Sequence, residues 1–482
     1  MSITANPQQV IDFFHAIEQI PRGSGNEQAV SDWLVAFAKE RNLEVTQDAA
    51  NNVIIKKPAT PGYEDRPTVI LQGHVDMVCE KNPGSTHDFM TDPIELEIKG
   101  DWLHAKETTL GADNAIAIAM ILAILDSDDI EHGPLEFLAT TSEETGMDGA
   151  LAVDGSLLSG TYLLNLDTEN EGEFIVSCAG GCRLDLSLDT NRRSTPERFD
   201  TALTVSIDGL SGGHSGIEIH KQRANANQLL SRALFELGHF YDFALAGFSG
   251  GSKHNAIPRQ ADATIVAAAT DLADVKSLLS KVEEHFKAEF APQDADVRIV
   301  IAQTDRPDTV MSDEAQRNLL SFLYVAPHGV IGMSRSLDNL VETSLNLAIV
   351  TDNVDTIDMR ISLRSLSVSP LEYLKYRMLT LATTYGFKAA VEGGYPAWEY
   401  EPGSELEKQA VEIYEKVSGV APAVTAVHAG LECGLLKEKL PNTQMISFGP
   451  TIENAHTPQE RLHLPSTERI YEYLKVLLKE LR

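Results

Sequence analysis

The sequence predicts an α/β protein of two domains, in which both ends of the chain build one α/β domain and an α+β domain is inserted between them. The chain has 482 residues, which is too long for a single compact core. Its first third alternates helices with near-continuous apolar strands, a pattern typical of a mostly parallel sheet covered on both faces. The same rhythm returns after Tyr395-Pro396, so we expect both ends to share one sheet.

The first third of the chain contains the clearest alternation. Ser24 and Glu27 have the spacing of a capping box for a helix through Val30 to Ala38. The elements expected after this helix are strands in VIIKK and TVILQGHVDM, a helix at Ala115–Leu125, and strands in LEFLATTSEE and TYLLNLD. Strands this apolar are expected to be buried within the sheet.

The middle of the chain mixes strands and helices in a way that is typical of an α+β domain. Strands are expected in TALTVSID, ATIVAA, RIVIAQ, SLNLAIVTD, TIDMRISLRS and AAVEGG. Helices are expected in ANANQLLSRALFELG, DLADVKSLLSKVEEHFKAEF and SPLEYLKYRMLTLA, and near Glu314–Val325. A helix at Ser404–Val417, a strand in MISFGP and a helix at Arg469–Leu481 complete the chain. We therefore assign residues 1–181 and 396–482 to one discontinuous domain and residues 182–395 to the inserted domain.

The composition argues against several classes of partner. Asp and Glu number 71 against 39 Lys and Arg, which leaves a formal net charge of -32. Nucleic acids and anionic membranes are bound by clustered Lys and Arg, so we expect neither as a partner. The longest apolar run, Ala115–Leu125, is much shorter than the ~20 residues needed to span a bilayer.

The N-terminal residues and the cysteines indicate a cytoplasmic protein. The stretch MSITANPQQVIDFF lacks the basic segment and the apolar core of a signal peptide. The four cysteines are Cys79, Cys178, Cys182 and Cys433. Four cysteines in so long a chain do not form a disulfide framework, so we expect them to be reduced and structural.

Polar side chains interrupt the apolar strands near their carboxyl ends. They are His74 and Asp76 in VILQGHVDM, Asp113 in TTLGADN, Glu143 and Glu144 in ATTSEETG, Asp167 in LLNLD and His456 in GPTIENAHTP. His74 and Asp76 lie two residues apart, so both would project from one face of a strand. Ligand crevices of open α/β sheets form at the carboxyl ends of the strands. We therefore expect these side chains to lie together at one edge of the sheet.

Each of these residues has an ordinary structural explanation when it is taken alone. A single His on a strand is usually a core or surface residue, an Asp before a helix is usually an N-cap, and an acidic pair usually lies in a solvated loop. Several such sites at equivalent positions are harder to explain in this way, because buried carboxylates without partners cost several kcal/mol. A shared metal cluster would satisfy them together. Imidazole with carboxylate ligands suits zinc, or manganese or cobalt.

The motifs resemble those of M20-type metallopeptidases, specifically the long cytosolic Xaa-His dipeptidase branch (aminoacyl-histidine dipeptidase, or peptidase D). The matching segments, in the order and spacing of that family, are QGHVDMV, TTLGADNAIAIA, TSEETGMDGA, NLDTE, GGHSGIEI, GSKHNAIPR, HAGLECGL and NAHTPQERL. They cover essentially the whole chain. The resemblance implies a zinc peptidase catalytic domain with an inserted lid domain, and a small peptide as the substrate.

The resemblance also implies a role for each polar residue at the sheet edge. The ligands of two Zn²⁺ ions, which Mn²⁺ or Co²⁺ could replace, would be His74 and Asp167 for one ion, Glu144 and His456 for the other, and Asp113 as the bridge. Glu143 would be the general base, and Asp76 would fix the ring of His74. The family also has a cis peptide after the bridging aspartate, here Asp113-Asn114.

In the inserted domain the resemblance points to residues that would bind the substrate. His214 would donate a hydrogen bond to the oxyanion, Asn255 and Arg364 would bind the terminal carboxylate, and Gly430 would supply a backbone contact. Taken alone, His214 is a turn residue in a glycine-rich loop and Arg364 a salt-bridge residue on an edge strand. We take the neighbouring His428 as structural. Members of the family commonly dimerise through the inserted domain, so we expect a homodimer.

The expected reaction is hydrolysis of unblocked dipeptides of the Xaa-His, carnosine-like type. Two zinc ions would activate a water molecule, and Glu143 would take its proton and deliver it to the leaving amine. The metal residues do not distinguish this reaction from that of an aminopeptidase, a carboxypeptidase or an N-acyl amino acid deacylase of the same fold, although the length of the inserted domain favours the dipeptidase. A non-catalytic binding protein would be expected to lack the base, and Glu143 is present.

Overall fold

The computed structural model describes residues 5–482, so residues 1–4 of the predicted first domain lie outside the described residues. The chain divides into two units. Unit 1 contains the residues up to Ser177 together with Tyr400–Ala426 and Leu431–Arg482, and unit 2 contains Cys178–Glu399 and Val427–Gly430. The sequence placed the boundaries at residues 181/182 and 395/396. It did not separate the short segment Val427–Gly430, which belongs to unit 2.

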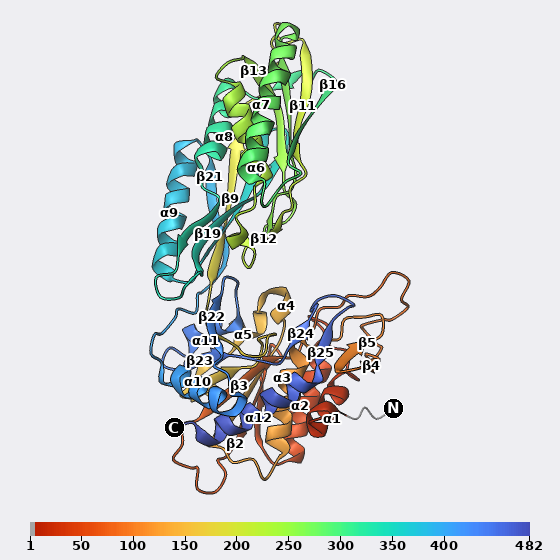
Figure 1. The fold of residues 1–482 in the computed structure, drawn as a ribbon, viewed down its shortest axis with the longest axis vertical. Helices are drawn as coiled ribbons and strands as arrows, with labels where there is room; N and C mark the ends of the chain where they lie inside the picture. Colours follow the sequence, from red (N-terminus) through yellow and green to blue (C-terminus); the bar gives the residue numbers. More distant parts are fainter. Residues whose placement is uncertain (1–4) are drawn as a thin grey trace. The chain divides into compact units, whose positions relative to one another are not determined.

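Unit 1 is built on an eight-stranded sheet with the strand order β1-β2-β6-β3-β7-β23-β8-β22. Its strands are β1 (Glu44–Gln47), β2 (Val53–Lys57), β3 (Val69–His74), β6 (Leu135–Thr140), β7 (Tyr162–Asn165), β8 (Glu173–Cys178), β22 (Ala423–Val427) and β23 (Gln444–Ser447). The central strands β6, β3, β7 and β23 are parallel, and β2 and β8 join them antiparallel. Because β23 pairs with β7, the two ends of the chain share one sheet, as the sequence predicted (Figure 1).

The other elements of unit 1 surround this sheet. The helices are α1 (Gln8–Ile17), α2 (Gln28–Glu40), α3 (Ala112–Asp126), α4 (Glu143–Gly146), α5 (Asp148–Ala152), α10 (Glu405–Ser418), α11 (Glu432–Lys439) and α12 (Leu464–Glu480). A smaller sheet contains β4 (Leu96–Lys99), β5 (Trp102–Ala105), β24 (Ile452–Glu453) and β25 (Arg461–His463). Every residue of β3, β6 and β7 is buried, as expected for covered parallel strands. Helix α3 is apolar all round and packs on β3 and α1, which makes it a central helix of the core.

The capping box predicted at Ser24 and Glu27 is wrong. Helix α2 begins at Gln28, and the side chain of its N-cap, Glu27, makes no capping hydrogen bond. The hydroxyl of Ser24 instead donates to Oδ2 of Asp76 (2.8 Å), and Oε1 of Glu27 accepts the backbone N–H of Ser142 (3.1 Å). Both side chains thus bind segments that are distant in sequence. These tertiary hydrogen bonds take the place of the local capping bonds that the sequence pattern predicted.

Unit 2 contains a nine-stranded sheet with the order β16-β11-β15-β13-β19-β20-β9-β21, in which β18 also pairs with β19. Its strands are β9 (Gly180–Asp189), β11 (Thr201–Asp208), β13 (Phe243–Gly250), β15 (Ala261–Ala267), β16 (Arg298–Thr304), β18 (Gly329–Met333), β19 (Val341–Asp352), β20 (Thr356–Ser365) and β21 (Lys388–Tyr395). Strand β20 lies between β19 and β9. Arg364 therefore lies on an interior strand and not, as its structural explanation assumed, on an edge strand.

Four helices and several short elements complete unit 2. The helices are α6 (Ala226–Leu237), α7 (Leu272–Phe290), α8 (Asp313–Val325) and α9 (Val368–Thr384), and the short strands are β10 (Arg193–Ser194), β12 (Gly213–His214), β14 (Ala256–Ile257) and β17 (Thr309–Val310). The helices bury their apolar faces with the sheet in one hydrophobic core. The chain also has short 3-10 segments at η1 (Gly155–Leu157), η2 (Ile219–Lys221) and η3 (Ala269–Asp271).

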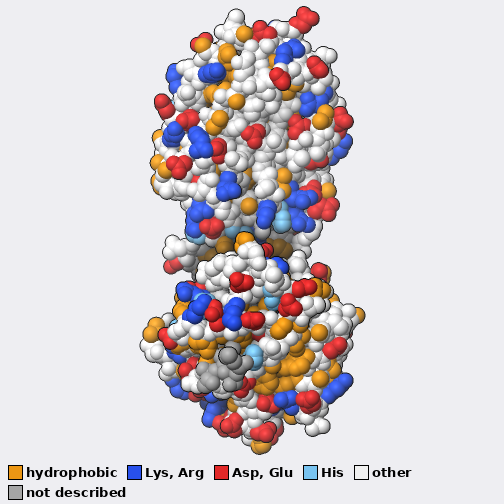
Figure 2. All heavy atoms as spheres, turned by 90° about the vertical axis from the view of Figure 1, so that its right-hand side faces the viewer, with side chains coloured by type: hydrophobic (Ala, Val, Ile, Leu, Met, Phe, Trp, Pro, Cys, Tyr) orange, Lys and Arg blue, Asp and Glu red, His pale blue; other side chains and the backbone are white. Residues whose placement is uncertain are grey.

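Three further observations concern the described residues of both units. Among residues 5–482, no helix combines the length and the apolar character that a membrane crossing requires. Figure 2 shows Lys and Arg side chains scattered among Asp and Glu on the face in view, without gathering into one basic patch. No disulfide joins the four cysteines.

Candidate functional site

The polar residues predicted at the sheet edge of unit 1 do lie beyond the carboxyl ends of the parallel strands. His74 is the last residue of β3, and Asp76 follows two residues later. Glu143 and Glu144 begin α4, directly after β6. Asp167 lies two residues beyond β7, and His456 lies beyond the parallel strand β23, after the short strand β24 of the smaller sheet. The structure thus brings together residues from four separate segments, as the pattern of interrupted strands predicted.

Asp113 has one carboxylate oxygen beside each of two imidazoles. Its Oδ1 lies 3.1 Å from Nε2 of His74, and its Oδ2 lies 3.1 Å from Nε2 of His456. The backbone at Asp113 and Asn114 is not helical, and the peptide between them is cis, as the resemblance implied. Asp113 is therefore not an N-cap, because its side chain points to the two imidazoles.

Each imidazole also has a second carboxylate beside it. Nε2 of His74 lies 3.5 Å from Oδ1 of Asp167, and Nε2 of His456 lies 3.0 Å from Oε1 of Glu144. Because each Nε2 makes its hydrogen bond to Asp113, neither of these two buried oxygens has a hydrogen-bond partner. Two groups of possible metal ligands result, in which the ligand atoms lie within 4.8 Å of one another: His74, Asp113 and Asp167, and Asp113, Glu144 and His456.

This arrangement fits a pair of divalent cations. Buried oxygens without hydrogen-bond partners are rare and costly, and a cation in each group would satisfy those of Asp167 and Glu144. The donors are imidazole nitrogens and carboxylate oxygens, which suit zinc, manganese or cobalt. Asp113 belongs to both groups, so one carboxylate could contact both cations.

The pKa values reflect a dense cluster of carboxylates. Burial raises the pKa of Asp167 to about 6, although His74 opposes the shift. Burial, with the charges of Asp113 and Asp167, raises the pKa of Glu169 to about 8. Burial alone would raise the pKa of Asp113, but hydrogen bonds with His456 and His74 outweigh it and hold that pKa below its ordinary value. Cations at this edge of the sheet would offset the excess negative charge.

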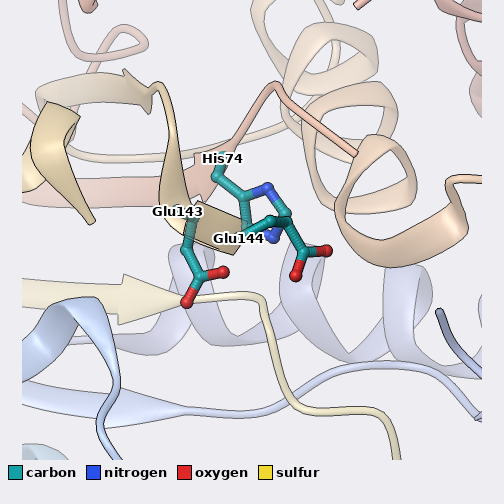
Figure 3. Close-up of side chains that lie close together, drawn as sticks. All are labelled: His74, Glu143 and Glu144. Atoms are coloured by element: carbon teal, nitrogen blue, oxygen red, sulfur yellow. The ribbon is translucent and has the colours of Figure 1, made fainter. Parts of the chain in front are cut away.

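Glu143 and Glu144 start the same short helix, and their carboxyl groups flank the ring of His74 in the view of Figure 3. The ligand atoms of these three residues also lie within 4.8 Å of one another. Burial raises the pKa of Glu143 well above its ordinary value, although His74 opposes the shift. Glu143 is therefore a carboxyl group beside the candidate metal ligands that can hold or release a proton.

Asp76 joins three segments of the site through its carboxylate. Its Oδ1 lies 3.3 Å from Nδ1 of His74 and accepts the backbone N–H of Glu143 (3.1 Å). Its Oδ2 lies 3.3 Å from the backbone N of Glu144, which donates to it, and accepts the hydroxyl of Ser24. Asp76 therefore lies beside the ring of His74, where the resemblance placed it, and its backbone carbonyl lies 3.2 Å from the same Nδ1. Its carboxylate also holds the start of α4, which sequence reasoning missed.

Sequence reasoning also missed buried carboxyl groups behind the site. Oε2 of Glu432 accepts hydrogen bonds from Nε2 of Gln72 (2.6 Å) and from the hydroxyl of Thr140 (2.8 Å). Burial raises the pKa of Glu432 to about 7, although His74 opposes the shift. One signal was available, because Gln72 is a polar residue in an apolar strand, two residues before His74. A second missed carboxylate, Glu460, lies in the NAHTPQERL segment and accepts backbone N–H groups ahead of Asp113.

The predicted substrate-binding residues all belong to unit 2. His214 pairs with Ala256 in the β12–β14 ladder, and both His214 and Asn255 line a cavity of about 850 Å³. Nδ1 of His214 accepts the backbone N–H groups of Gly216 (3.1 Å) and Ile217 (3.2 Å). Burial and the charge of Arg364 lower the pKa of His214. The neutral ring therefore carries its hydrogen on Nε2 and can donate it.

Tyr395 lies beside both Arg364 and Gly430. Nη1 of Arg364 donates to the hydroxyl of Tyr395 (2.5 Å), and a Cβ placed on Gly430 would lie 2.7 Å from the ring of Tyr395. Nε of Arg364 is buried without a hydrogen-bond partner. His428 is buried, and its Nε2 lies 2.7 Å from the hydroxyl of Ser344.

Comparison with known proteins identifies the family of this chain and several of its relatives. Residues 70–480 match the family described as peptidase family M20/M25/M40. The chain is 38% identical over 476 residues to the cytosol non-specific dipeptidase of Escherichia coli (strain K12), which covers 99% of this chain and 98% of that protein. The crystal structure of aminoacylhistidine dipeptidase from Vibrio alginolyticus superposes with a TM-score of 0.94 at 38% identity, covering 99% of this chain and 98% of that one. An aminopeptidase structure from Bacillus cereus shares the fold, with a TM-score of 0.57 and 16% identity.

Proposed function

The chain belongs to peptidase family M20/M25/M40, and from this membership we propose that it is a metal-dependent hydrolase of the peptide bond in unblocked dipeptides. The observation that carries the proposal is the pair of ligand groups that share Asp113, with Glu143 beside them. Relatives that match nearly the whole chain are named dipeptidases. We further propose that the preferred substrates are of the Xaa-His, carnosine-like type.

The residues of unit 1 would hold two divalent cations. The proposed ligands are His74 and Asp167 for one cation, Glu144 and His456 for the other, and Asp113 for both. We propose zinc as the native metal, which manganese or cobalt could replace, because the donors are imidazoles and carboxylates. When bound, such a pair lowers the pKa of water and polarises the scissile carbonyl.

Glu143 is proposed as the general base. Its carboxylate would take a proton from the attacking water as the C–O bond forms, and would deliver this proton to the leaving amine as the C–N bond breaks. Its raised pKa supports this role, since the carboxyl group can then exchange a proton nearer to neutral pH. Asp76 would keep the ring of His74 and the backbone of Glu143 in place during these steps.

Residues of unit 2 are proposed to bind the substrate. His214 would donate its Nε2 hydrogen to the oxyanion, which the two N–H groups bound to its Nδ1 support. Arg364 and Asn255 would bind the terminal carboxylate, and the backbone of Gly430 would contact the substrate. We also propose that the protein acts in the cytoplasm and as a homodimer through unit 2. Light scattering after gel filtration tests the dimer.

The function is tested with a panel of substrates. We would compare β-Ala-His, Gly-His, Ala-Ala, a tripeptide and an N-acetyl amino acid, using zinc-loaded wild type and Glu143→Gln with measured metal content. The expected result is cleavage of unblocked dipeptides only, which is lost in Glu143→Gln although the metal is retained. Cleavage of the tripeptide would indicate an aminopeptidase, and cleavage of the acetylated compound a deacylase. Full activity of Glu143→Gln would contradict the proposed base.

A further inference from the structure

A buried carboxylate, Glu460, holds the backbone just ahead of Asp113. Its side chain is 2% exposed. Oε2 accepts the backbone N–H groups of Leu110 (2.7 Å) and Gly111 (2.9 Å). Oε1 accepts the backbone N–H of Ala112 (2.8 Å) and lies 3.4 Å from the donating N of Asp113. One carboxylate therefore binds four consecutive amide groups that end at the residue shared by both ligand groups.

Glu460 also belongs to the segment that carries His456. It lies four residues after His456, and its own backbone N–H donates to the carbonyl of Thr457 (3.0 Å). This segment turns sharply, because Asn454 and His456 both have positive φ values of 56° and 61°. The side chain of Glu460 thus links the two segments that supply Asp113 and His456, which contact each other at 3.1 Å.

A buried arginine binds a carbonyl group of the same backbone. Nη2 of Arg22 donates to the carbonyl of Gly111 (2.7 Å), and its Nη1 donates to the carbonyls of Val75 and Asp76 (3.0 Å each). Gly111 has a φ of 70°, and a Cβ there would lie 2.4 Å from Nη2 of Arg22. The amide groups of this segment are therefore held by Glu460 and one of its carbonyls by Arg22, which leaves it little freedom to shift.

We propose that Glu460 is a positioning residue that sets the separation of Asp113 and His456 and thereby the affinity of the metal pair. This inference rests on the proposed metal centre but not on the identity of the substrate. Its physical basis is that a carboxylate offers two acceptor oxygens to the four N–H groups, whereas an amide offers one oxygen and turns an NH₂ group toward the remaining donors. Residues that orient metal ligands in this way typically contribute about 10- to 100-fold to metal affinity.

A buried carboxylate away from the candidate ligands provides the control. Glu136 is also buried and accepts the consecutive backbone N–H groups of Ser159 (2.8 Å) and Gly160 (3.1 Å). It lies near the start of β6, whereas the candidate ligands follow the end of that strand. Glu136 also accepts the hydroxyl of Ser159 (2.8 Å) and lies 3.4 Å from Nζ of Lys56. Glu136→Gln therefore removes a buried carboxylate that binds backbone N–H groups, without touching the segments of Asp113 and His456.

The test compares wild type, Glu460→Gln and Glu136→Gln after removal of metal by a chelator. Thermal unfolding of the metal-free proteins is measured first, then calorimetric titration with Zn²⁺ and the visible absorption spectrum with Co²⁺. Both variants are expected to unfold at lower temperature than wild type. Only Glu460→Gln is expected to bind Zn²⁺ about 10- to 100-fold more weakly and to change the Co²⁺ spectrum. If Glu460→Gln does not fold, Glu460→Asp keeps the charge with a shorter reach and is expected to weaken Zn²⁺ binding while Glu136→Asp does not.

Two outcomes would overturn the inference, and they are distinguishable. Wild-type Zn²⁺ affinity and an unchanged Co²⁺ spectrum in the Glu460 variants would mean that this carboxylate serves the fold alone, and the proposed function would stand. Absence of Zn²⁺ binding by wild type would instead refute the proposed metal centre itself, and the positioning role with it.

Discussion

The carboxylate of Asp113 lies 3.1 Å from the imidazole of His456, although 343 residues separate them in the sequence. The contact exists because β23, from the last part of the chain, pairs with β7, from the first part. The segment after β23 then reaches the carboxyl edge of the sheet, where His74 and Asp113 also lie. The candidate site therefore depends on the closure of unit 1 by its C-terminal strand, and several predictions test it.

Replacement of His456 should remove one of two bound metal ions. We expect His456→Ala to bind close to half the zinc of wild type. We also expect its kcat/KM to fall at least about 100-fold, because loss of a direct metal ligand should cost no less activity than loss of a residue that only orients a ligand. Zinc content per subunit and dipeptide hydrolysis measure both effects. His463→Ala is the matched control, since His463 packs on Trp102 in the same unit and belongs to no ligand group found in the described chain. Two full equivalents of zinc in His456→Ala would contradict the assignment.

Asp76→Asn should weaken metal binding without removing a ligand. The amide keeps the size of the side chain but loses the charge beside Nδ1 of His74. We expect about a 10- to 100-fold loss of zinc affinity, measured by competition with a chelator. Ser24→Ala, which removes only the hydroxyl that donates to Asp76, should have a smaller effect. An equal effect of both variants would mean that Asp76 acts through local folding rather than through His74.

Arg364→Lys should raise KM for dipeptides more than it lowers kcat. Lysine cannot bind a carboxylate with two parallel hydrogen bonds, and the loss of one charge-assisted bond corresponds to about a 10-fold or larger increase in KM. Steady-state kinetics on an unblocked dipeptide measure the change. Arg360→Lys is the control on the same strand, because Arg360 pairs with Asp185 (2.7 Å) at the surface. A kcat effect without a KM effect would reject the carboxylate-binding role.

Burial of His328 should make unit 2 less stable in mild acid. Burial lowers the pKa of His328 from 6.5 to about 4, and its buried Nε2 has no hydrogen-bond partner while Nδ1 lies 3.2 Å from Nδ2 of Asn225. The unfolded chain therefore binds a proton below pH 6.5 that the folded chain does not bind until about pH 4. The free energy of unfolding is unaffected above this pH range, and it falls as the pH falls from 6.5 to about 4. The resulting loss of unfolding free energy is at most about 3 kcal/mol, and solvent screening of this partly buried side chain reduces it.

Urea unfolding at about pH 7 and about pH 5 tests the role of His328. The metal-free wild type should lose more stability between these two conditions than His328→Gln loses, because glutamine does not titrate. His285→Gln, at an exposed position of α7, should behave as wild type. The same pH dependence in wild type and His328→Gln would show that other groups cause the acid sensitivity.

Interpretation of the sequence reached the main elements of the fold and the members of the candidate metal groups. The apolar strands β3, β6 and β7 were evident because every residue of a covered parallel strand is buried. The polar residues that end these strands were evident because they interrupt apolar runs. Their roles as ligands, base and substrate-binding residues remain proposals.

Strand order could not be predicted from the local pattern. Arg364 lies on β20, which has a neighbour on both sides, whereas its sequence is equally compatible with an edge strand. The contact between Arg364 and Tyr395 could not be predicted for the same reason. Tyr395 lies on β21, which pairs with β9, a strand far from it in the sequence. Apolar periodicity identifies which residues are buried, but it does not identify the strand that lies beside them.

The sequence by itself determined many of the strands and helices, among them β3, β6, β7 and α3, and the imidazoles and carboxylates that interrupt the apolar strands near their carboxyl ends. Only the tertiary structure decided how these groups are held: Ser24 binds Asp76 instead of capping α2, and Glu460 and Arg22 hold the backbone ahead of Asp113. The physical reason is that burial and periodicity act along neighbouring residues and leave a pattern in the sequence. A buried charge is satisfied by backbone amides and carbonyls of distant segments, and backbone groups are the same for almost every residue.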